Sequence, residues 1–205
     1  MEIERLEKQI NFCKEIDKEK FIKRQTLLTD KETYENDSEH AWHMAVMCLI
    51  LSEYSNNNID LVKTLSMILI HDIVEIDAGD TYAYDEDAVI NQHSREEKAA
   101  NRIFGLLPVD QKEKFISLWN EFEEGKTNEA KFAHTLDNFQ PCMLNNETGG
   151  KKWKENKVRL SQILNRNKLT DEGSADLWKY QFENFIMPNV KSENIIDDMG
   201  NQECI

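Results

Sequence analysis

Hydrophobic residues recur along most of this chain at intervals of three and four, the spacing of an amphipathic helix. In the first segment, residues 2–13, the side chains of Ile3, Leu6, Ile10 and Cys13 would share one face. Comparable patterns predict further helices over residues 18–24, 38–51, 59–72, 89–107, 109–124, 128–146, 150–167 and 173–187. No stretch alternates in a way that requires a sheet. The pattern therefore predicts an all-α fold.

Local signals suggest where some of these helices begin and end. Ser38 is expected to be an N-cap, because serine is preferred there, and Glu39 in the first turn suits the helix dipole. The stop for this helix is the run of three asparagines at 56–58. The next helix is apolar nearly all round, which favours a central place in the core. The polar segments 29–37 and 77–87 are predicted loops.

The chain has 205 residues, enough for one well-buried domain, and no stretch rich in Pro, Gly and Ser divides it. We therefore predict a single domain over residues 1–190. The acidic residues 191–205 are expected to form a flexible tail.

The formal net charge of −14 argues against binding a nucleic acid polymer or an anionic membrane through a broad basic surface. A small anionic ligand stays possible, since one Lys or Arg beside a metal can override the overall field. The four cysteines are widely spread without a CxxC pair, and neither a signal peptide nor an 18-residue apolar run is present. We therefore expect reduced thiols and a cytoplasmic location.

The pair His71-Asp72 ends the most apolar run of the chain, and Glu75 follows three residues later. Buried ionisable groups are usually paired with one another or bound to a metal, and imidazole and carboxylate are both good transition-metal ligands. The alternative is a pair that caps a helix end and faces water. The residue types by themselves leave both interpretations open.

Two more ionisable residues lie on apolar stretches of predicted helices, namely His40 and Asp137. Together with His71 and Asp72 they would provide two imidazoles and two carboxylates from three helices. Such a set could form an octahedral site with positions open for water. Periodicity alone does not show that these helices converge.

The order His40, His71-Asp72, Asp137 resembles the H…HD…D signature of the HD-domain metal-dependent phosphohydrolase superfamily. It is most similar to the branch of small HD hydrolases that includes bacterial 5′-deoxynucleotidases and their eukaryotic relatives. The resemblance covers most of residues 20–145, and the matching segments are 38–40, 71–80, 96–98, 106–108, 118–123 and 130–132. It implies an HD-type helical bundle in a single domain.

The resemblance implies that His40, His71, Asp72 and Asp137 bind one divalent metal ion per chain, whether Mn, Co, Mg, Fe or Zn. A binuclear HD oxygenase would need additional ligands. Only three other histidines are available for that purpose: His43, His93 and His134.

The same resemblance implies roles around the metal. Glu75 would be the acid/base that activates or orients the attacking water, and Asp80 would lie at the pocket edge near the sugar or the scissile phosphate. Arg24 would hold the substrate phosphate, as a guanidinium can with two donors.

Two positions depart from the pattern of the branch. Gln25 stands where the bacterial enzymes have an aromatic residue that helps exclude a ribose 2′-hydroxyl. His134 replaces a lysine three residues before the final aspartate, and it could contact phosphate or a second metal. These departures leave the sugar preference open.

The resulting functional prediction is a metal-dependent phosphohydrolase that acts on (deoxy)nucleoside 5′-monophosphates. Two alternatives are a phosphatase or phosphodiesterase for another small phosphate ester, and a non-catalytic nucleotide sensor. A homodimer is expected from the relatives, and the apolar face of the N-terminal helix would suit one.

Overall fold

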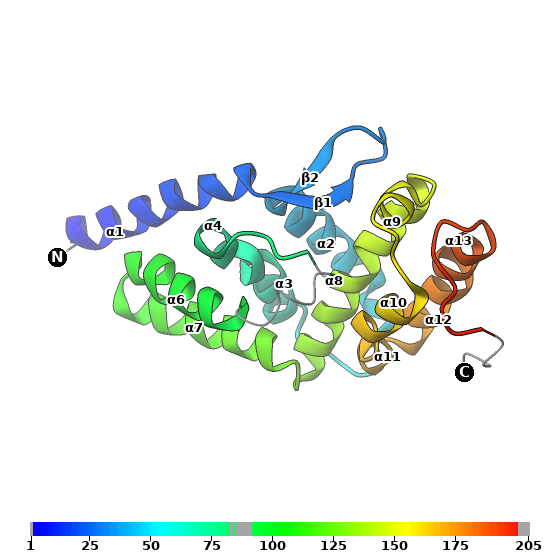
Figure 1. Cartoon of the computed structure of the whole chain (residues 1–205). Helices are drawn as coiled ribbons and strands as arrows, with labels where there is room; N and C mark the ends of the chain where they lie inside the picture. The colour runs from blue at the N-terminus through cyan, green and yellow to red at the C-terminus, as the bar shows by residue number, and fades with distance from the viewer. Residues whose placement is uncertain (1, 83, 85–91, 201–205) are drawn as a thin grey trace.

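The computed structural model describes residues 2–82, 84 and 92–200. Helices dominate it, as predicted (Figure 1). The α-helices are α1 (Glu2–Glu15), α2 (Asp37–Leu51), α3 (Leu61–Ile70), α4 (Glu75–Ala78), α6 (Gln92–Ile103), α7 (Val109–Glu124), α8 (Asn128–Glu147), α9 (Lys151–Glu155), α10 (Leu160–Arg166), α11 (Thr170–Gly173), α12 (Ala175–Gln181) and α13 (Met187–Lys191). Short 3-10 segments are η1 (Ile16–Phe21), η2 (Ser52–Tyr54), η3 (His71–Val74) and η4 (Phe104–Leu106), and a π-helical turn is η5 (Phe182–Ile186).

A small antiparallel hairpin is the exception to the helical prediction. Its strands are β1 (Lys23–Leu27) and β2 (Tyr34–Asn36). The predicted helix over 18–24 is therefore wrong in its second half, and the predicted loop over 29–37 contains a strand. Strands of five and three residues are too short to give a recognisable alternation.

Helix α2 begins one residue earlier than predicted, and its cap is Asn36 rather than Ser38. The Asn36 side chain accepts a hydrogen bond from the Glu39 backbone N–H, and the Glu39 carboxylate accepts one from the Asn36 N–H, both at 3.0 Å. This reciprocal pair satisfies two free donors at the helix start. Ser38 instead donates to Glu19 Oε2 at 3.1 Å.

The apolar helix predicted over 59–72 is α3, which starts after the N-cap Asp60 and ends at Ile70. The backbone then tightens into η3 and continues as α4. His71 and Asp72 thus stand at a change of winding rather than inside a regular helix.

The helices predicted from 89 and 109 are α6 and α7. Residues 89–91 lie outside the described part of the chain, and α6 ends at Ile103, before η4. Helix α7 has the predicted bounds, and it is followed by Gly125, whose φ of 59° is left-handed and favours glycine.

Helix α8 is the centre of the domain and contacts α2, α3, α7, α11 and α12. Its buried face supplies Phe132, Ala133, Leu136 and Phe139 to the larger of two hydrophobic clusters. The smaller cluster joins η3, α6, η4 and α7, and Phe12 of α1 packs into it. The rest of α1 extends past the bundle (Figure 1), which leaves its apolar positions exposed: Ile3, Leu6 and Ile10.

The C-terminal part is more broken than the two predicted helices. The described residues form α9 to α13, and the segment after α13 packs back onto the domain. Ile195 is 1% exposed, and the backbone of Ile196 exchanges hydrogen bonds with Val158 and Leu160. In the predicted tail, residues 191–200 therefore contain a segment that lies against the domain, while residues 201–205 lie outside the described chain.

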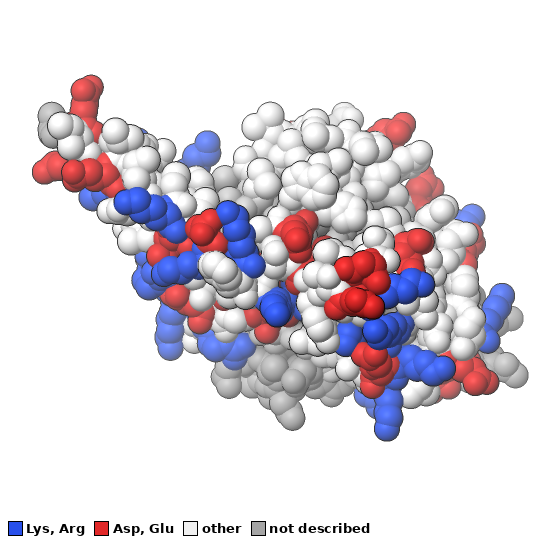
Figure 2. Space-filling view, turned by 90° about the horizontal axis from the view of Figure 1, so that it is seen from above, with Lys and Arg blue, Asp and Glu red and all other residues white. Residues whose placement is uncertain are grey.

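On the face shown in Figure 2, basic side chains are interspersed with acidic ones rather than gathered into a continuous patch. Within the described residues, no helix has the length and apolar character needed to cross a membrane. Cys13, Cys48 and Cys142 are free thiols, and Cys204 lies outside the described chain.

Candidate metal centre

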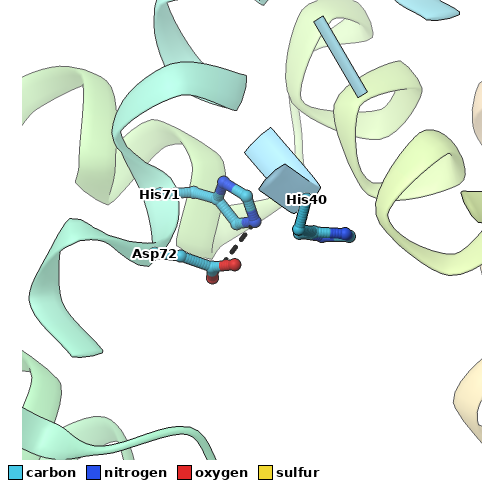
Figure 3. Close-up of side chains that lie close together, drawn as sticks. All are labelled: His40, His71 and Asp72. Atoms are coloured by element: carbon cyan, nitrogen blue, oxygen red, sulfur yellow. Dashed lines mark ion pairs between the residues drawn. The ribbon is translucent and has the colours of Figure 1, made fainter. Parts of the chain in front are cut away.

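Three of the predicted metal ligands come together where α2 meets η3. His40, His71 and Asp72 each offer one ligand atom, and these atoms all lie within 4.8 Å of one another (Figure 3). The two histidines are buried, and His71 Nε2 is 3.1 Å from Asp72 Oδ1. The pair at the end of the apolar run therefore does not face water as a simple helix cap.

Asp137 of α8 completes the group. Its Oδ1 lies 3.1 Å from His40 Nε2 and 3.9 Å from His71 Nε2. The structure thus brings together all four side chains that were predicted as ligands, from α2, η3 and α8. Their convergence depends on packing between segments up to about a hundred residues apart.

Hydrogen bonds fix both imidazoles so that Nε2 faces the cluster. His71 Nδ1 donates to the Ile68 carbonyl at 2.8 Å, and His40 Nδ1 donates to Gln140 Oε1 at 2.9 Å. In the neutral imidazole the other nitrogen then carries a lone pair, as metal binding requires. Buried His71 Nε2 approaches Asp72 Oδ1 at 3.1 Å, but among the described residues it has no partner with the geometry of a hydrogen bond. Two such nitrogens with two carboxylate oxygens fit a divalent transition metal.

The pKa values of the two carboxyl groups in the cluster depend on the neighbouring cations and imidazoles. Burial would raise the pKa of Asp72, but His71 and Arg24 hold it well below its usual range. Burial would likewise raise the pKa of Asp137, and His40 and Arg166 hold it low. Both carboxylates are therefore ionised and able to act as ligands.

The imidazoles respond in opposite ways. Burial would lower the pKa of His71, but the neighbouring Asp72 and Asp137 raise it to about 9. Burial and the nearby Arg24 lower the pKa of His40. In the metal-free site the His71 imidazolium therefore compensates part of the carboxylate charge. A metal cation bound to the neutral imidazole would compensate the same charge.

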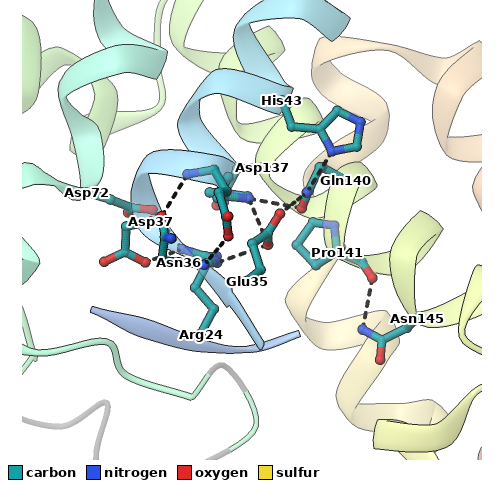
Figure 4. A network of polar contacts seen from close by, with 12 residues as sticks. Arg24, Glu35, Asn36, Asp37, His43, Asp72, Asp137, Gln140, Pro141 and Asn145 are labelled. Atoms are coloured by element: carbon teal, nitrogen blue, oxygen red, sulfur yellow. Dashed lines mark hydrogen bonds and ion pairs between the residues drawn. The ribbon is translucent and has the colours of Figure 1, made fainter. Parts of the chain in front are cut away.

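Arg24 of β1, the predicted phosphate-binding residue, lies beside the cluster and contacts three carboxylates (Figure 4). Its Nη1 donates to Asp72 Oδ2 at 2.7 Å and to Asp37 Oδ1 at 3.3 Å, and its Nε is 3.7 Å from Glu35 Oε2. Its side chain is 13% exposed. The contact with Asp72 uses the carboxylate oxygen that does not approach His71.

Gln140 is a site residue that the sequence reasoning missed. It is fully buried, and besides accepting from His40 it donates to Glu35 Oε1 at 2.5 Å and lies 3.1 Å from His43 Nδ1. Its position three residues after Asp137, on an apolar helix face, is the signal that could have identified it. Through this contact His43 lies beside the four predicted ligands rather than among them.

Glu75 is 7% exposed, and its Oε2 has no hydrogen-bond partner among the described residues. Burial and the carboxylates of Asp72 and Asp37 raise the pKa of Glu75 well above its usual value. Burial also raises the pKa of Asp80, with a contribution from Asp72. Such shifted carboxyl groups beside a cavity are typical of functional sites.

The cluster borders a cavity of about 470 Å³, which is large enough for a small organic ligand. His71, Asp72, Glu75, Asp80 and Asp137 line it, together with Arg24 and Arg166. Arg166, at the end of α10, donates from Nη2 to Asp137 Oδ2 at 3.0 Å. The sequence reasoning did not identify this arginine, because it follows Asp137 by 29 residues and lies in no recognised motif.

The two positions that depart from the branch pattern also line the cavity. Gln25 is an exposed residue of β1. His134 packs its ring on Phe122 at a centroid distance of 4.1 Å, and its Nε2 donates to the Phe122 carbonyl at 2.7 Å. Only Nδ1 of His134 is then left for a ligand.

Comparison with known proteins identifies a family and several similar proteins. The family profile described as "HD domain" matches residues 16–178. The chain is 31% identical over 116 residues to 5′-deoxynucleotidase HDDC2 of Mus musculus, a match that covers 57% of each protein. The corresponding protein of Dictyostelium discoideum is 28% identical over 139 residues, covering 65% of this chain and 73% of that one. The chain therefore spans little more than half the length of the mouse relative.

A solved structure matches over much more of the molecule. The crystal structure of a predicted metal-dependent phosphohydrolase from Magnetospirillum magnetotacticum MS-1 is 43% identical and superposes with a TM-score of 0.88. The match covers 93% of this chain and 95% of that one.

Proposed function

The chain belongs to the HD-domain family, and we propose that it is a metal-dependent phosphohydrolase that converts (deoxy)nucleoside 5′-monophosphates to a nucleoside and phosphate. The observation that carries this proposal is the convergence of His40, His71, Asp72 and Asp137 beside one cavity, which the last three of them line. The names of the mouse and slime-mould relatives support the substrate class, and the bacterial structure supports the reaction type.

In this proposal the four side chains hold one divalent cation, whose identity we leave among Mn, Co, Mg, Fe and Zn. The chemistry that such a cation supplies is polarisation of the phosphoryl group and a lowered pKa for water. The ion-paired carboxylates and the two fixed imidazoles present their donor atoms without large rearrangement. The protein's contribution is thus a preorganised set of ligands.

Glu75 is the proposed acid/base of the reaction. It lines the cavity beside Asp72, and its carboxylate oxygen without a partner is free to accept a proton from the attacking water. A raised pKa suits this task, because proton transfer is most effective near the working pH. Arg24 and Asp80 are proposed to lie against the phosphate and the sugar, respectively, since both line the same cavity.

The test is phosphate release from a panel of ribo- and deoxyribonucleoside 5′-monophosphates by protein loaded with Mn, Co or Mg. We expect release from several members of the panel. Glu75→Gln should abolish turnover and keep the metal, because an amide in this position would not take up a proton. Metal-loaded protein that binds nucleotides and releases no phosphate would refute the proposal and favour the nucleotide sensor.

Gln25 is the reason for including ribonucleotides as well as deoxyribonucleotides in the panel. It is exposed at the cavity in the place of the expected aromatic residue, so the wall beside the sugar is less apolar here. We propose that ribonucleotides and deoxyribonucleotides are both accepted. A strong preference for deoxyribonucleotides would contradict this.

The expected homodimer also stays a proposal. It is supported by the exposure of Ile3, Leu6 and Ile10 on α1, which are 73%, 56% and 45% exposed. Sedimentation of the intact chain and of Leu6→Glu would test it, and a monomeric wild type would refute it. The cytoplasmic location continues to rest on the sequence alone.

A further inference from the structure

The cavity is rich in negative charge for a site that would take a phosphate ester. Among the described residues, six acidic ones line it against four lysines and arginines: Asp72, Glu75, Asp80, Glu96, Glu123 and Asp137, against Arg24, Lys152, Arg166 and Lys168. A phosphate dianion needs more compensation than one metal ion provides in such surroundings. It is therefore important which of the four cations stands next to the metal ligands with donors to spare. Lys168 is exposed, and the described residues give its side chain no contact with the four ligand residues.

Arg24 is already heavily committed. It contacts Asp72, Asp37 and Glu35, and its side chain is only 13% exposed. Lys152 donates to the Tyr34 hydroxyl at 2.7 Å and to Glu155 at 2.8 Å.

Arg166 differs in both respects. Its side chain is 46% exposed, and Asp137 is the one partner that the structure gives it among the described residues. A guanidinium has five N–H donors, so most of those on Arg166 stay available at the cavity wall. The donor in use contacts Asp137 Oδ2, and Oδ1 of the same carboxylate lies 3.1 Å from His40 Nε2. The charge of Arg166 thus stands next to the ligand atoms.

We propose that Arg166 binds the substrate phosphate, as a guanidinium supplied by α10 in addition to Arg24 of β1. It would hold Asp137 through one N–H and donate from others to phosphate oxygens. Charge-assisted hydrogen bonds of this kind are strong and directional. The inference rests on the proposed phosphohydrolase function, but it concerns anion binding and can be tested without turnover.

The probe is inorganic phosphate, titrated by calorimetry into Mn-loaded protein, with the metal content of each sample measured by mass spectrometry. The variants are Arg166→Gln and Arg166→Lys. The matched control is Arg5→Gln, because Arg5 is also 46% exposed and also pairs with one aspartate, Asp110, away from the cavity. Circular dichroism checks that each variant is folded.

We expect Arg166→Gln to weaken phosphate binding roughly 10- to 100-fold at unchanged metal content, as loss of a hydrogen bond to a charged group implies. Arg166→Lys should recover part of the affinity, and Arg5→Gln should behave as wild type. In turnover assays KM should rise more than kcat falls.

Three results would overturn the inference: no measurable phosphate binding by the wild type, equal binding by Arg166→Gln, or binding that returns fully when Arg166→Gln is saturated with metal. The last would mean that Arg166 only positions Asp137. If phosphate binding depends on Arg166 but no nucleotide is hydrolysed, the inference is supported while the proposed function fails.

Discussion

Gln140 offers the sharpest test of how the metal site is held. Replacing it with methionine keeps the size and shape of the side chain but removes the acceptor for His40 Nδ1 and the donor to Glu35. His40 would then be free to adopt the other tautomer or to rotate. We predict that Gln140→Met binds a divalent metal more weakly and lowers the stability of the fold.

The size of both effects follows from burial. Loss of a residue that orients a metal-binding histidine typically costs 10- to 100-fold in metal affinity, or about 1.4 to 2.8 kcal/mol. His40 and Glu35 are 0% and 1% exposed, so water cannot replace the lost hydrogen bonds. Each polar atom left without a partner costs about 1–3 kcal/mol in the free energy of unfolding.

The assay is competition for Zn or Mn against a chelating dye, combined with urea unfolding of the metal-free protein. The matched control is Gln181→Met. Gln181 is also 0% exposed and donates to Asn167 Oδ1 at 2.7 Å, but none of the four ligand residues is among the contacts that the structure describes for it. We expect this control to lose stability and to keep wild-type metal affinity.

Equal metal affinity in wild type and Gln140→Met would refute the role of Gln140 in fixing the imidazole. An equal loss of affinity in Gln181→Met would show that the effect comes from a general loosening of the fold.

Three further predictions concern charge, metal and capping. Burial and the neighbouring Glu96 raise the pKa of Glu123 from 4.5 to about 7, so the native state binds more protons than the unfolded state between these values. The free energy of unfolding of metal-free protein should therefore fall as pH rises through this window. In thermal melts at several pH values, Glu123→Gln should show a smaller decrease in stability with pH than wild type. The same pH dependence in both proteins would contradict the prediction. Metal at a concentration of a hundred times its Kd should raise the free energy of unfolding by about 2.7 kcal/mol. Removing the metal with EDTA should therefore lower the melting temperature, and a melting temperature that EDTA does not change would argue against a bound ion. Thr127→Ala removes the side chain that accepts from the Ala130 N–H at the start of α8 and should cost about 1 kcal/mol in urea unfolding, whereas Thr127→Ser should cost little.

The sequence was a good guide where the signal was long and periodic. Helix α7 has the predicted bounds because sixteen residues carry a repeated apolar face and a glycine follows them. The sequence was a poor guide where a few residues decide the conformation. The hairpin of β1 and β2 has too few positions to show a period, and the C-terminal helices are broken by turns that an averaged pattern does not register.

For the site as well, some residues could be predicted from the sequence and others could not. The sequence by itself determined which ionisable groups are candidates for the site. These are two histidines and two aspartates on apolar stretches, with Glu75 one turn beyond the His-Asp pair, and their order resembles the HD signature. Tertiary structure decided what surrounds them. Gln140 and Arg166 carry no motif, and their contacts with His40 and Asp137 arise only when α8 packs on α2 and the C-terminal helices close over it. A residue type shows which chemistry is available, but a hydrogen bond across a hundred residues is decided by packing.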